Sequence, residues 1–223
     1  MTDVSPSSTD SPVRSEANHR WVRARVGNQQ VIDTTDARYV WEHRYYPQWY
    51  IPVGDVNAEI VPTGQTTATE RGEAHSVDLL LAGDTRISDA GWIHPDSPLA
   101  ELRDRIRLRW EAMDQWFEED IEVFVHPRSP YTRVDVLPSS RHVVIAIDGT
   151  VVADSTSPSI LYETGLPARF YLPPDDVRTD LLVPTDTSSA CPYKGVARYW
   201  SVTIDGTTHA DVAWGYDTPL PES

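Results

Sequence analysis

Cysteine and basic residues are scarce in this chain of 223 residues. Cys191 is its single cysteine, which excludes an intrachain disulfide and a Cys-rich zinc site. Lys and Arg number 19 against 34 Asp and Glu, so the formal net charge is -15. Because nucleic-acid binding relies on Lys and Arg side chains that neutralise phosphates, neither DNA nor RNA is an expected partner.

Long apolar runs are also missing. Residues 1–20 lack the apolar core of a secretory signal, and no stretch approaches the roughly 20 apolar residues of a membrane span. We therefore expect a cytoplasmic protein with no membrane partner. Because residues 1–20 are rich in Ser, Thr, Asp and Pro, we expect them to form a disordered tail.

Several motifs of common enzymes are absent. The chain has no Gly-x-Gly-x-x-Gly, Walker loop, His-Glu-x-x-His or Gly-x-Ser-x-Gly sequence. Its seven histidines are scattered without the spacing of metal ligands. We accordingly predict no metal and no cofactor.

Short alternating segments indicate strands. Val22, Ala24 and Val26 alternate with arginines, and an apolar run at His142–Ile147 precedes an Asp148-Gly149 turn. The 18 Pro and 11 Gly are spread throughout, which favours a mainly β, antiparallel fold.

An internal repeat divides the chain. Displaced by 121 positions, residues 22–56 align without a gap on residues 143–177, and nine of the 35 pairs are identical. We therefore predict two diverged copies of one compact antiparallel β domain, at residues 21–98 and 141–223.

Residues 99–140, between the copies, are predicted to hold a connecting amphipathic helix and a Pro/Arg-rich loop. Ser97 is a plausible N-cap, with Pro98 at the first helical position. Apolar residues then recur at spacings of 4, 4, 3 and 4, as on one helix face. They are Leu102, Ile106, Trp110, Met113 and Phe117.

The second copy carries the densest group of reactive side chains. Cys191 lies close to Lys194, and a nearby cation can make a thiol nucleophilic, so both are candidate catalytic residues. Alternatively, Cys191 is a small buried side chain and Lys194 forms a surface salt bridge. The first copy has Glu70-Arg71-Gly72 in this region, with no Cys or Lys. This asymmetry favours a site in the second copy.

Further residues are candidates for ligand binding. Arg169 differs from its counterpart Gln48, whereas Glu163 and Tyr171 recur in the first copy and so have a structural alternative. Tyr193, Trp214 and Tyr216 would form walls, or else core. The stiff loop that contains two prolines would clamp an anion, or simply link the copies. Its candidate residues are His126, Arg128 and Arg133.

These motifs resemble the domain of unknown function 427 family. The resemblance rests on Cys191-Pro192-Tyr193-Lys194-Gly195 and Trp214-x-Tyr216, and is weaker in the first copy at Glu70-Arg71-Gly72. It implies a compact β-tent-like fold. Some relatives of that fold hold zinc through pairs of Cys, which this chain lacks, so the resemblance does not change the expectation of no zinc.

Three functions follow from the sequence. The first is binding or acting on a small polar or anionic molecule in the second copy, between aromatic walls and the cations Lys194, Arg169 and Arg128. The second is an enzyme that depends on Cys191, aided by Lys194 or His126. The third is a non-catalytic protein-interaction module. The sequence leaves the ligand, the reaction and the oligomeric state open.

Overall fold

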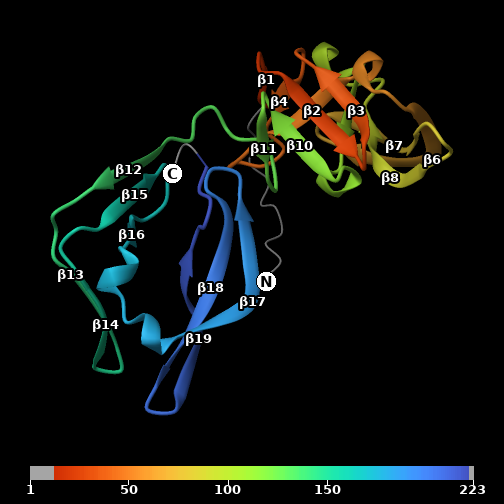
Figure 1. Ribbon diagram of the computed structural model, residues 1–223. Helices are drawn as coiled ribbons and strands as arrows, with labels where there is room; N and C mark the ends of the chain where they lie inside the picture. Colours follow the sequence, from red (N-terminus) through yellow and green to blue (C-terminus); the bar gives the residue numbers. More distant parts are fainter. Residues whose placement is uncertain (1–12, 221–223) are drawn as a thin grey trace. The chain divides into compact units, whose positions relative to one another are not determined.

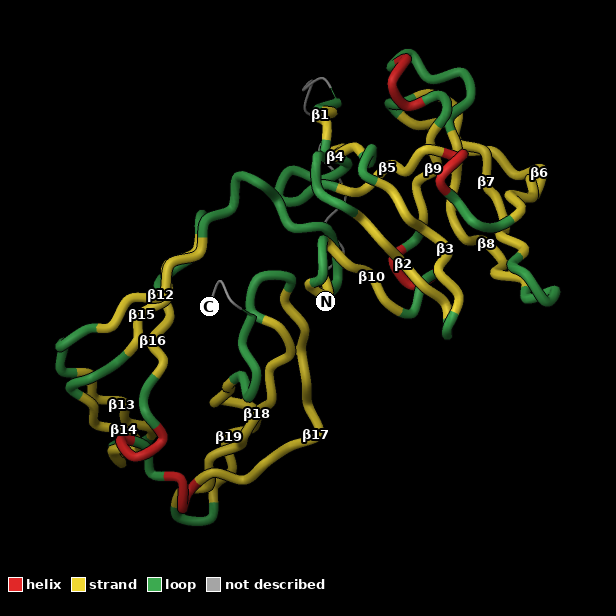
Figure 2. Tube along the Cα trace, turned by 45° about the horizontal axis from the view of Figure 1, so that its top comes forward, coloured by secondary structure: helices red, strands yellow, loops and turns green. Residues whose placement is uncertain are grey.

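The computed structural model describes residues 13–220, which divide into two compact units with a boundary between Pro127 and Arg128. Within the described residues the chain forms strands joined by turns, and each helix is a 3-10 turn of three residues. Figure 2 shows these short helices in red between the strands. The prediction of a mainly β, antiparallel fold is confirmed.

The first unit contains two antiparallel sheets (Figure 1). In order across the larger sheet, the strands are β1 (Ser15–Ala17), β4 (Arg38–Val40), β5 (Gln48–Pro52), β9 (Arg105–Leu108), β8 (Arg86–Ile93), β7 (Gly72–Leu80) and β6 (Glu59–Thr69). The smaller sheet is β11 (Ile121–Val123), β10 (Gln115–Glu118), β2 (Val22–Val26) and β3 (Gln29–Thr34). The 3-10 turns of the first unit are η1 (Val53–Asp55), η2 (Ala100–Leu102) and η3 (Trp110–Ala112).

The core of the first unit forms where side chains of the two sheets meet. Ile51 and Ile106 of the larger sheet and Val22 of the smaller sheet are completely buried. The ring of Trp49 stacks on that of Trp110 at 6.0 Å and is tilted against that of Trp116 at 5.6 Å. In strands such as β2 and β9, buried residues alternate with more exposed ones, so that one face of each sheet turns inward.

The second unit contains antiparallel sheets with fewer strands (Figure 1). They are β12–β15–β16 (Val134–Pro138, Ser159–Glu163, Arg169–Tyr171), β13–β14 (Val143–Ile147, Thr150–Ser155) and β17–β18–β19 (Leu182–Cys191, Gly195–Ile204, Thr207–Gly215). The 3-10 turns η4 (Pro174–Asp176) and η5 (Thr179–Leu181) precede β17.

Strand registers repeat between the two units. Tyr50 lies opposite Arg38, and Tyr171 lies opposite Ser159, each partner displaced by 121 positions. Both units have an isolated bridge at equivalent residues, one of which joins Ala153 to Val177. The predicted duplication therefore extends to individual residue pairs, because identical registers place side chains on the same faces.

Two aspartates that recur in the copies stabilise the same turn. Asp55 Oδ2 accepts a hydrogen bond from Thr34 Oγ1, and Asp176 Oδ2 accepts one from Ser155 Oγ, both at 2.6 Å. At this turn, the same polar residue recurs in both copies because it stabilises the fold.

The prediction of a connecting helix is wrong. Residues 100–118 instead form η2, β9, η3 and β10, and they belong to the first unit. β9 pairs with β5 on one edge and β8 on the other. In Arg105–Leu108 the arginines alternate with apolar residues, and non-local pairing selects this two-residue period over the longer helical one.

The predicted disordered tail is partly within the described residues. Ser15–Ala17 form β1 and pair with β4, so this part of residues 1–20 is ordered as a strand. Residues 1–12 lie outside the described part of the chain.

The larger sheet of the first unit contains a strand, β9, that has no counterpart in the described part of the second unit. In the first unit, β9 joins β5 to β8; the counterparts of these two strands are β16 and β19. In the described part of the second unit, no strand lies between β16 and β19, which belong to separate sheets. Side chains near this position are consequently more exposed than their first-unit equivalents: Tyr50 is completely buried, whereas Tyr171 is only partly buried.

Candidate functional site

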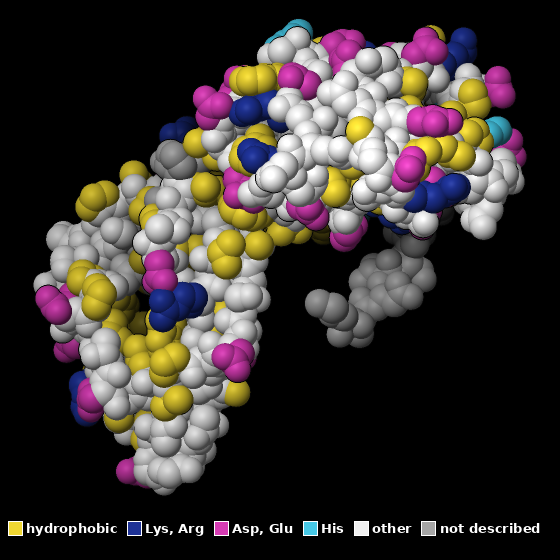
Figure 3. All heavy atoms as spheres, turned by 45° about the vertical axis from the view of Figure 1, so that its right-hand side comes forward, with side chains coloured by type: hydrophobic (Ala, Val, Ile, Leu, Met, Phe, Trp, Pro, Cys, Tyr) yellow, Lys and Arg dark blue, Asp and Glu magenta, His cyan; other side chains and the backbone are white. Residues whose placement is uncertain are grey.

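The second unit has two adjoining pockets where β16 approaches β19. The first, of about 200 Å³, is lined by Val136, Leu161, Tyr171, Lys194, Tyr216 and Pro219. The second, of about 190 Å³, is lined by Glu163, Leu166, Pro167, Arg169, Tyr171, Lys194, Trp214 and Tyr216. Lys194, Tyr171 and Tyr216 are shared, so the two pockets form one site. Figure 3 shows apolar side chains gathered around a hollow on the visible face of this unit.

A cation and a carboxylate form the polar centre of the site. Nζ of Lys194 donates a hydrogen bond to Oε2 of Glu163 at 2.5 Å, and both side chains are largely buried. Burial is the largest single effect and opposes the charged form of Lys194, but the interactions with Glu163 and Cys191 together outweigh it, and the pKa of Lys194 is raised. The ammonium group is therefore charged at neutral pH.

Lys194 is held by a tight hairpin. It precedes Gly195, which has a φ of +93° and begins β18. That left-handed conformation favours glycine, and a Cβ there would come within 3.4 Å of the carbonyl oxygen of Thr218. The left-handed backbone, more than the space around it, thus favours glycine directly after Lys194.

Aromatic side chains form the walls. The rings of Tyr171 and Tyr216 lie 6.2 Å apart, and Nε1 of Trp214 donates to the hydroxyl of Tyr171 at 3.4 Å. Burial, followed by the neighbouring Tyr171, raises the pKa of Tyr216 above its ordinary value. The Tyr216 hydroxyl is therefore a neutral hydrogen-bonding group.

Arg169 supplies a second positive charge on the rim. Its side chain is exposed on β16, and it shares the strand face of Tyr171 because the two are two residues apart. Among residues 13–220, no acidic side chain lies within salt-bridge distance of Arg169. With Glu163 already paired to Lys194, the site has an excess positive charge.

The family follows from comparison of the sequence with known families. Residues 14–119 and 135–223 each match the family described as Domain of unknown function (DUF427). The chain belongs to this family. Comparison with curated proteins found no match. The resemblance inferred from the Cys191–Gly195 and Trp214-x-Tyr216 motifs is thereby confirmed.

The two DUF427 matches begin at equivalent positions, since residue 14 displaced by 121 is residue 135. No helix among residues 13–220 is long and apolar enough to cross a membrane. In the same range, His, Cys, Asp and Glu side chains form no group of three or more placed to hold a metal ion.

Six of the predicted site residues come together in this DUF427 site. They are Lys194, Arg169, Glu163, Tyr171, Trp214 and Tyr216. Sequence reasoning missed the apolar residues of the lining, which are Val136, Leu161, Leu166, Pro167 and Pro219. A signal for Pro219 exists, because Asp217-Thr218-Pro219-Leu220 repeats Asp96-Ser97-Pro98-Leu99.

Cys191 and Tyr193 lie near Lys194 in sequence but line neither pocket. Tyr193 is buried, and its hydroxyl accepts a hydrogen bond from the backbone N–H of Ser129 at 2.7 Å. Burial raises the pKa of Tyr193. Cys191 is partly buried at the end of β17, opposite Gly195. Tyr193 therefore helps to fix the hairpin that carries Lys194, whereas Cys191 interacts with Lys194 and favours its charged form.

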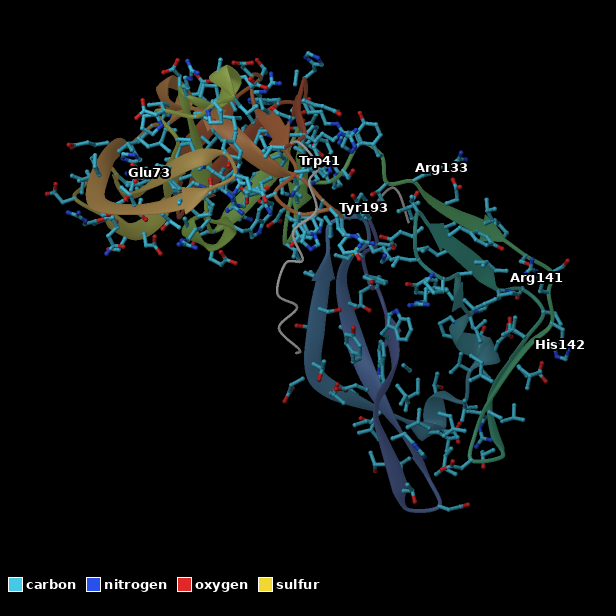
Figure 4. All side chains as sticks on the ribbon, turned by 180° about the vertical axis from the view of Figure 1, so that it is seen from behind. Trp41, Glu73, Arg133, Arg141, His142 and Tyr193 are labelled. Carbon is cyan, nitrogen blue, oxygen red and sulfur yellow. The ribbon has the colours of Figure 1, made fainter. Side chains whose placement is uncertain are left out.

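The remaining predicted residues lie outside the site. His126 belongs to the first unit and stacks on Tyr46, with ring centroids 3.9 Å apart. Arg128 is buried in the loop that begins the second unit. Arg133 is exposed and pairs with Asp135 at 2.9 Å, at one end of β12 (Figure 4). None of the three lines either pocket.

The first DUF427 copy has a buried version of the same cluster. Glu42 is the counterpart of Glu163, and its Oε1 accepts from the hydroxyl of Tyr50 at 2.8 Å. Arg71 precedes Gly72 as Lys194 precedes Gly195, and its Nε lies 3.9 Å from Glu42. The ring of His94 lies 6.1 Å from that of Tyr50, as Tyr216 does from Tyr171.

Proposed function

We propose that the second DUF427 copy binds a small polar molecule with an anionic group, at the site around Lys194. The observation that carries this proposal is Arg169, a cation on the rim of an aromatic pocket with no acidic partner among residues 13–220. A guanidinium group offers parallel N–H donors that match a carboxylate or phosphate.

The walls favour a small ligand with a flat or apolar body. Tyr171, Tyr216 and Trp214 surround the polar centre, and aromatic walls with few polar anchors are typical of small-molecule sites. The two adjoining pockets, of about 200 and 190 Å³, together lie at the small end of typical ligand sites, which measure roughly 300–1,000 Å³. The ligand is therefore of about amino-acid size.

Benzoate and benzyl alcohol test this proposal, because they share a ring and differ in charge. Binding to the full chain is measured by saturation-transfer NMR. We expect benzoate to bind more tightly than benzyl alcohol, and Arg169→Gln to weaken benzoate binding about tenfold, as loss of a charge-assisted hydrogen bond predicts.

Arg141→Gln is the matched control. Arg141 is an exposed arginine of the same unit, beyond the far end of β12, and lines neither pocket (Figure 4). It should leave benzoate binding unchanged. Equal binding of the two probes, or equal effects of the two arginine substitutions, would contradict the proposal.

A further inference from the structure

An arginine of the first copy occupies the position that is open in the second. Arg107 of β9 lies opposite Tyr50 of β5 and opposite Trp92 of β8. Its guanidinium carbon lies 4.7 Å from the centroid of the Trp92 ring, and Nη2 lies 3.4 Å from Oε2 of Glu42. The guanidinium is thus bound by a ring, a carboxylate and the flanking tyrosine strand.

The counterparts of these three groups line one pocket of the second copy. Tyr171 and Glu163 correspond to Tyr50 and Glu42 by the displacement of 121. Trp214 lies opposite Tyr199, as Trp92 lies opposite Ser76 in the matching strand pair. All three line the pocket of about 190 Å³, where the described residues place no strand between β16 and β19.

We infer that this pocket binds a guanidinium group, and that the ligand is a small guanidino carboxylic acid. The guanidinium would lie on Trp214 and pair with Glu163, while the carboxylate would meet Arg169. This inference rests on the proposed function, since it adds a cationic group to the anionic ligand.

The existing pair with Lys194 does not exclude a second cation at Glu163. In the first copy, Oε1 of Glu42 faces Arg71 while Oε2 faces Arg107, so one carboxylate serves two cations. In the second copy, Lys194 contacts Oε2 of Glu163 and leaves the other oxygen for a ligand. A planar guanidinium also stacks on an indole ring, which a compact ammonium group does less well.

Three amino-acid-sized probes separate the parts of this inference. L-arginine carries both groups, L-citrulline replaces the guanidinium with a neutral urea of similar shape, and agmatine lacks the carboxylate. In calorimetric titrations of the full chain, we expect L-arginine to bind at least about tenfold more tightly than L-citrulline, the loss expected for one charged contact. Agmatine should bind more weakly than L-arginine.

Two substitutions test the contacts. Trp214→Leu and Glu163→Gln should each weaken L-arginine binding while leaving L-citrulline binding little changed. Trp214 is 41% exposed, so its replacement is compatible with folding even if Glu163→Gln disturbs the pair with Lys194. Phe170→Leu is the control, because Phe170 is 43% exposed on β16 and lines neither pocket.

A guanidinium can also be supplied by a peptide that adds a strand to the sheet, so a peptide probe is tested as well. The acetylated and amidated peptide Arg-Ile-Arg-Leu, which copies residues 105–108, presents the arginine that fills this position in the first copy. Binding of the peptide without binding of L-arginine would overturn the small-molecule ligand and assign the guanidinium to a partner strand.

The remaining outcomes distinguish this inference from the proposed function. Equal binding of L-arginine and L-citrulline, or binding of neither while benzoate still depends on Arg169, would overturn the guanidinium inference alone. Failure of benzoate, L-arginine and the peptide together would overturn both.

Discussion

At the scale of single residues, the same position carries different chemistry in the two copies. Glu42 and Glu163 are identical and both pair with a cation that precedes a left-handed glycine. The cation is Arg71 in one copy and Lys194 in the other. Because Glu163 recurs in the first copy, the sequence offered a structural alternative to its role as a candidate ligand-binding residue, and its contact with Lys194 is compatible with that alternative. The same carboxylate also lines the second pocket, so a residue that recurs for folding can still belong to a site.

The Glu163 carboxylate should control the pKa of Lys194. Burial disfavours the ammonium, whereas Glu163 and Cys191 favour it, so Glu163→Gln removes part of what opposes the effect of burial and the pKa of Lys194 falls. At a fixed pH near 8 a larger fraction of the amine is then neutral, and its acetylation is faster. Because Lys194 is the only lysine of the chain, mass spectrometry of its peptide after treatment with acetic anhydride measures this rate.

Glu42→Gln is the matched control, since it removes the equivalent carboxylate from the first unit. It should leave the acetylation rate of Lys194 unchanged. A rate that is the same in Glu163→Gln and in the unaltered protein would show that Glu163 does not set the protonation of Lys194.

At the scale of elements, residues 105–118 show why a pattern alone misassigned a segment. The apolar stripe from Leu102 to Phe117 fits a helix, yet Arg105–Leu108 also fits a strand. The strand is favoured over the helix because β9 pairs with β5 on one side and β8 on the other, and so provides hydrogen-bond partners for the backbone groups at the edges of both strands. The pairing of β9 with β5 joins residues more than 50 positions apart and leaves no trace in local spacing.

Trp116 and Phe117 discriminate between these two structures. Trp116 is 3% exposed in the core, whereas Phe117 is only partly buried and lies near Arg25. We expect Trp116→Ala to lower the free energy of unfolding by about 3–5 kcal/mol, as for large core aromatics. Phe117→Ala should cost less. Urea denaturation followed by circular dichroism measures both.

The helical stripe includes Phe117 and omits Trp116, so it predicts the opposite order. A larger loss in Phe117→Ala than in Trp116→Ala would therefore contradict β10 as the structure has it.

At the scale of the whole molecule, each unit has its own core. The buried cluster of the first unit draws on both sheets and includes Ile106 and Trp116 from residues 105–118. The second unit has a smaller buried cluster, of Val152, Val202 and Ile204. In the described residues it has no counterpart of β9 or β10. The two copies therefore share their strand registers but not their number of strands. The pockets lie where the described part of the second unit has no counterpart of β9.

The first unit should lose stability in mild acid through His94. Burial, aided by the charge of Arg71, lowers the pKa of His94 from its ordinary 6.5. The unfolded chain therefore gains a proton as the pH falls below about 6.5, while the folded chain stays neutral at His94. Stability is lost through that window down to the lowered pKa, at no more than about 1.4 kcal/mol per pH unit.

His94→Gln should remove this part of the pH dependence, measured as urea denaturation at pH 7.5 and pH 5.5. The pKa of His126 is lowered by burial too, so a smaller dependence of the same sign should persist. His142→Gln, at an exposed histidine of the second unit, should leave the first unit's dependence unchanged. An unchanged dependence in His94→Gln would mean that the pKa of His94 does not differ between the folded and the unfolded chain.

The sequence by itself determined the β class, the duplication and six residues of the candidate site. Alternation, turn residues and a fixed displacement of 121 are local or periodic features, and they can be read from the order of residues alone. Comparison of the copies also singled out Arg169, because its counterpart is Gln48.

Only the tertiary structure decided which segment completes each sheet and which side chains face a pocket. It turned Tyr193 to the backbone of Ser129 and stacked His126 on Tyr46. It also placed Arg107 between β5 and β8, whereas the described part of the second unit has no strand at the equivalent position between β16 and β19. These outcomes depend on backbone pairing and burial between distant segments, and such non-local energies are not encoded in any short stretch of sequence.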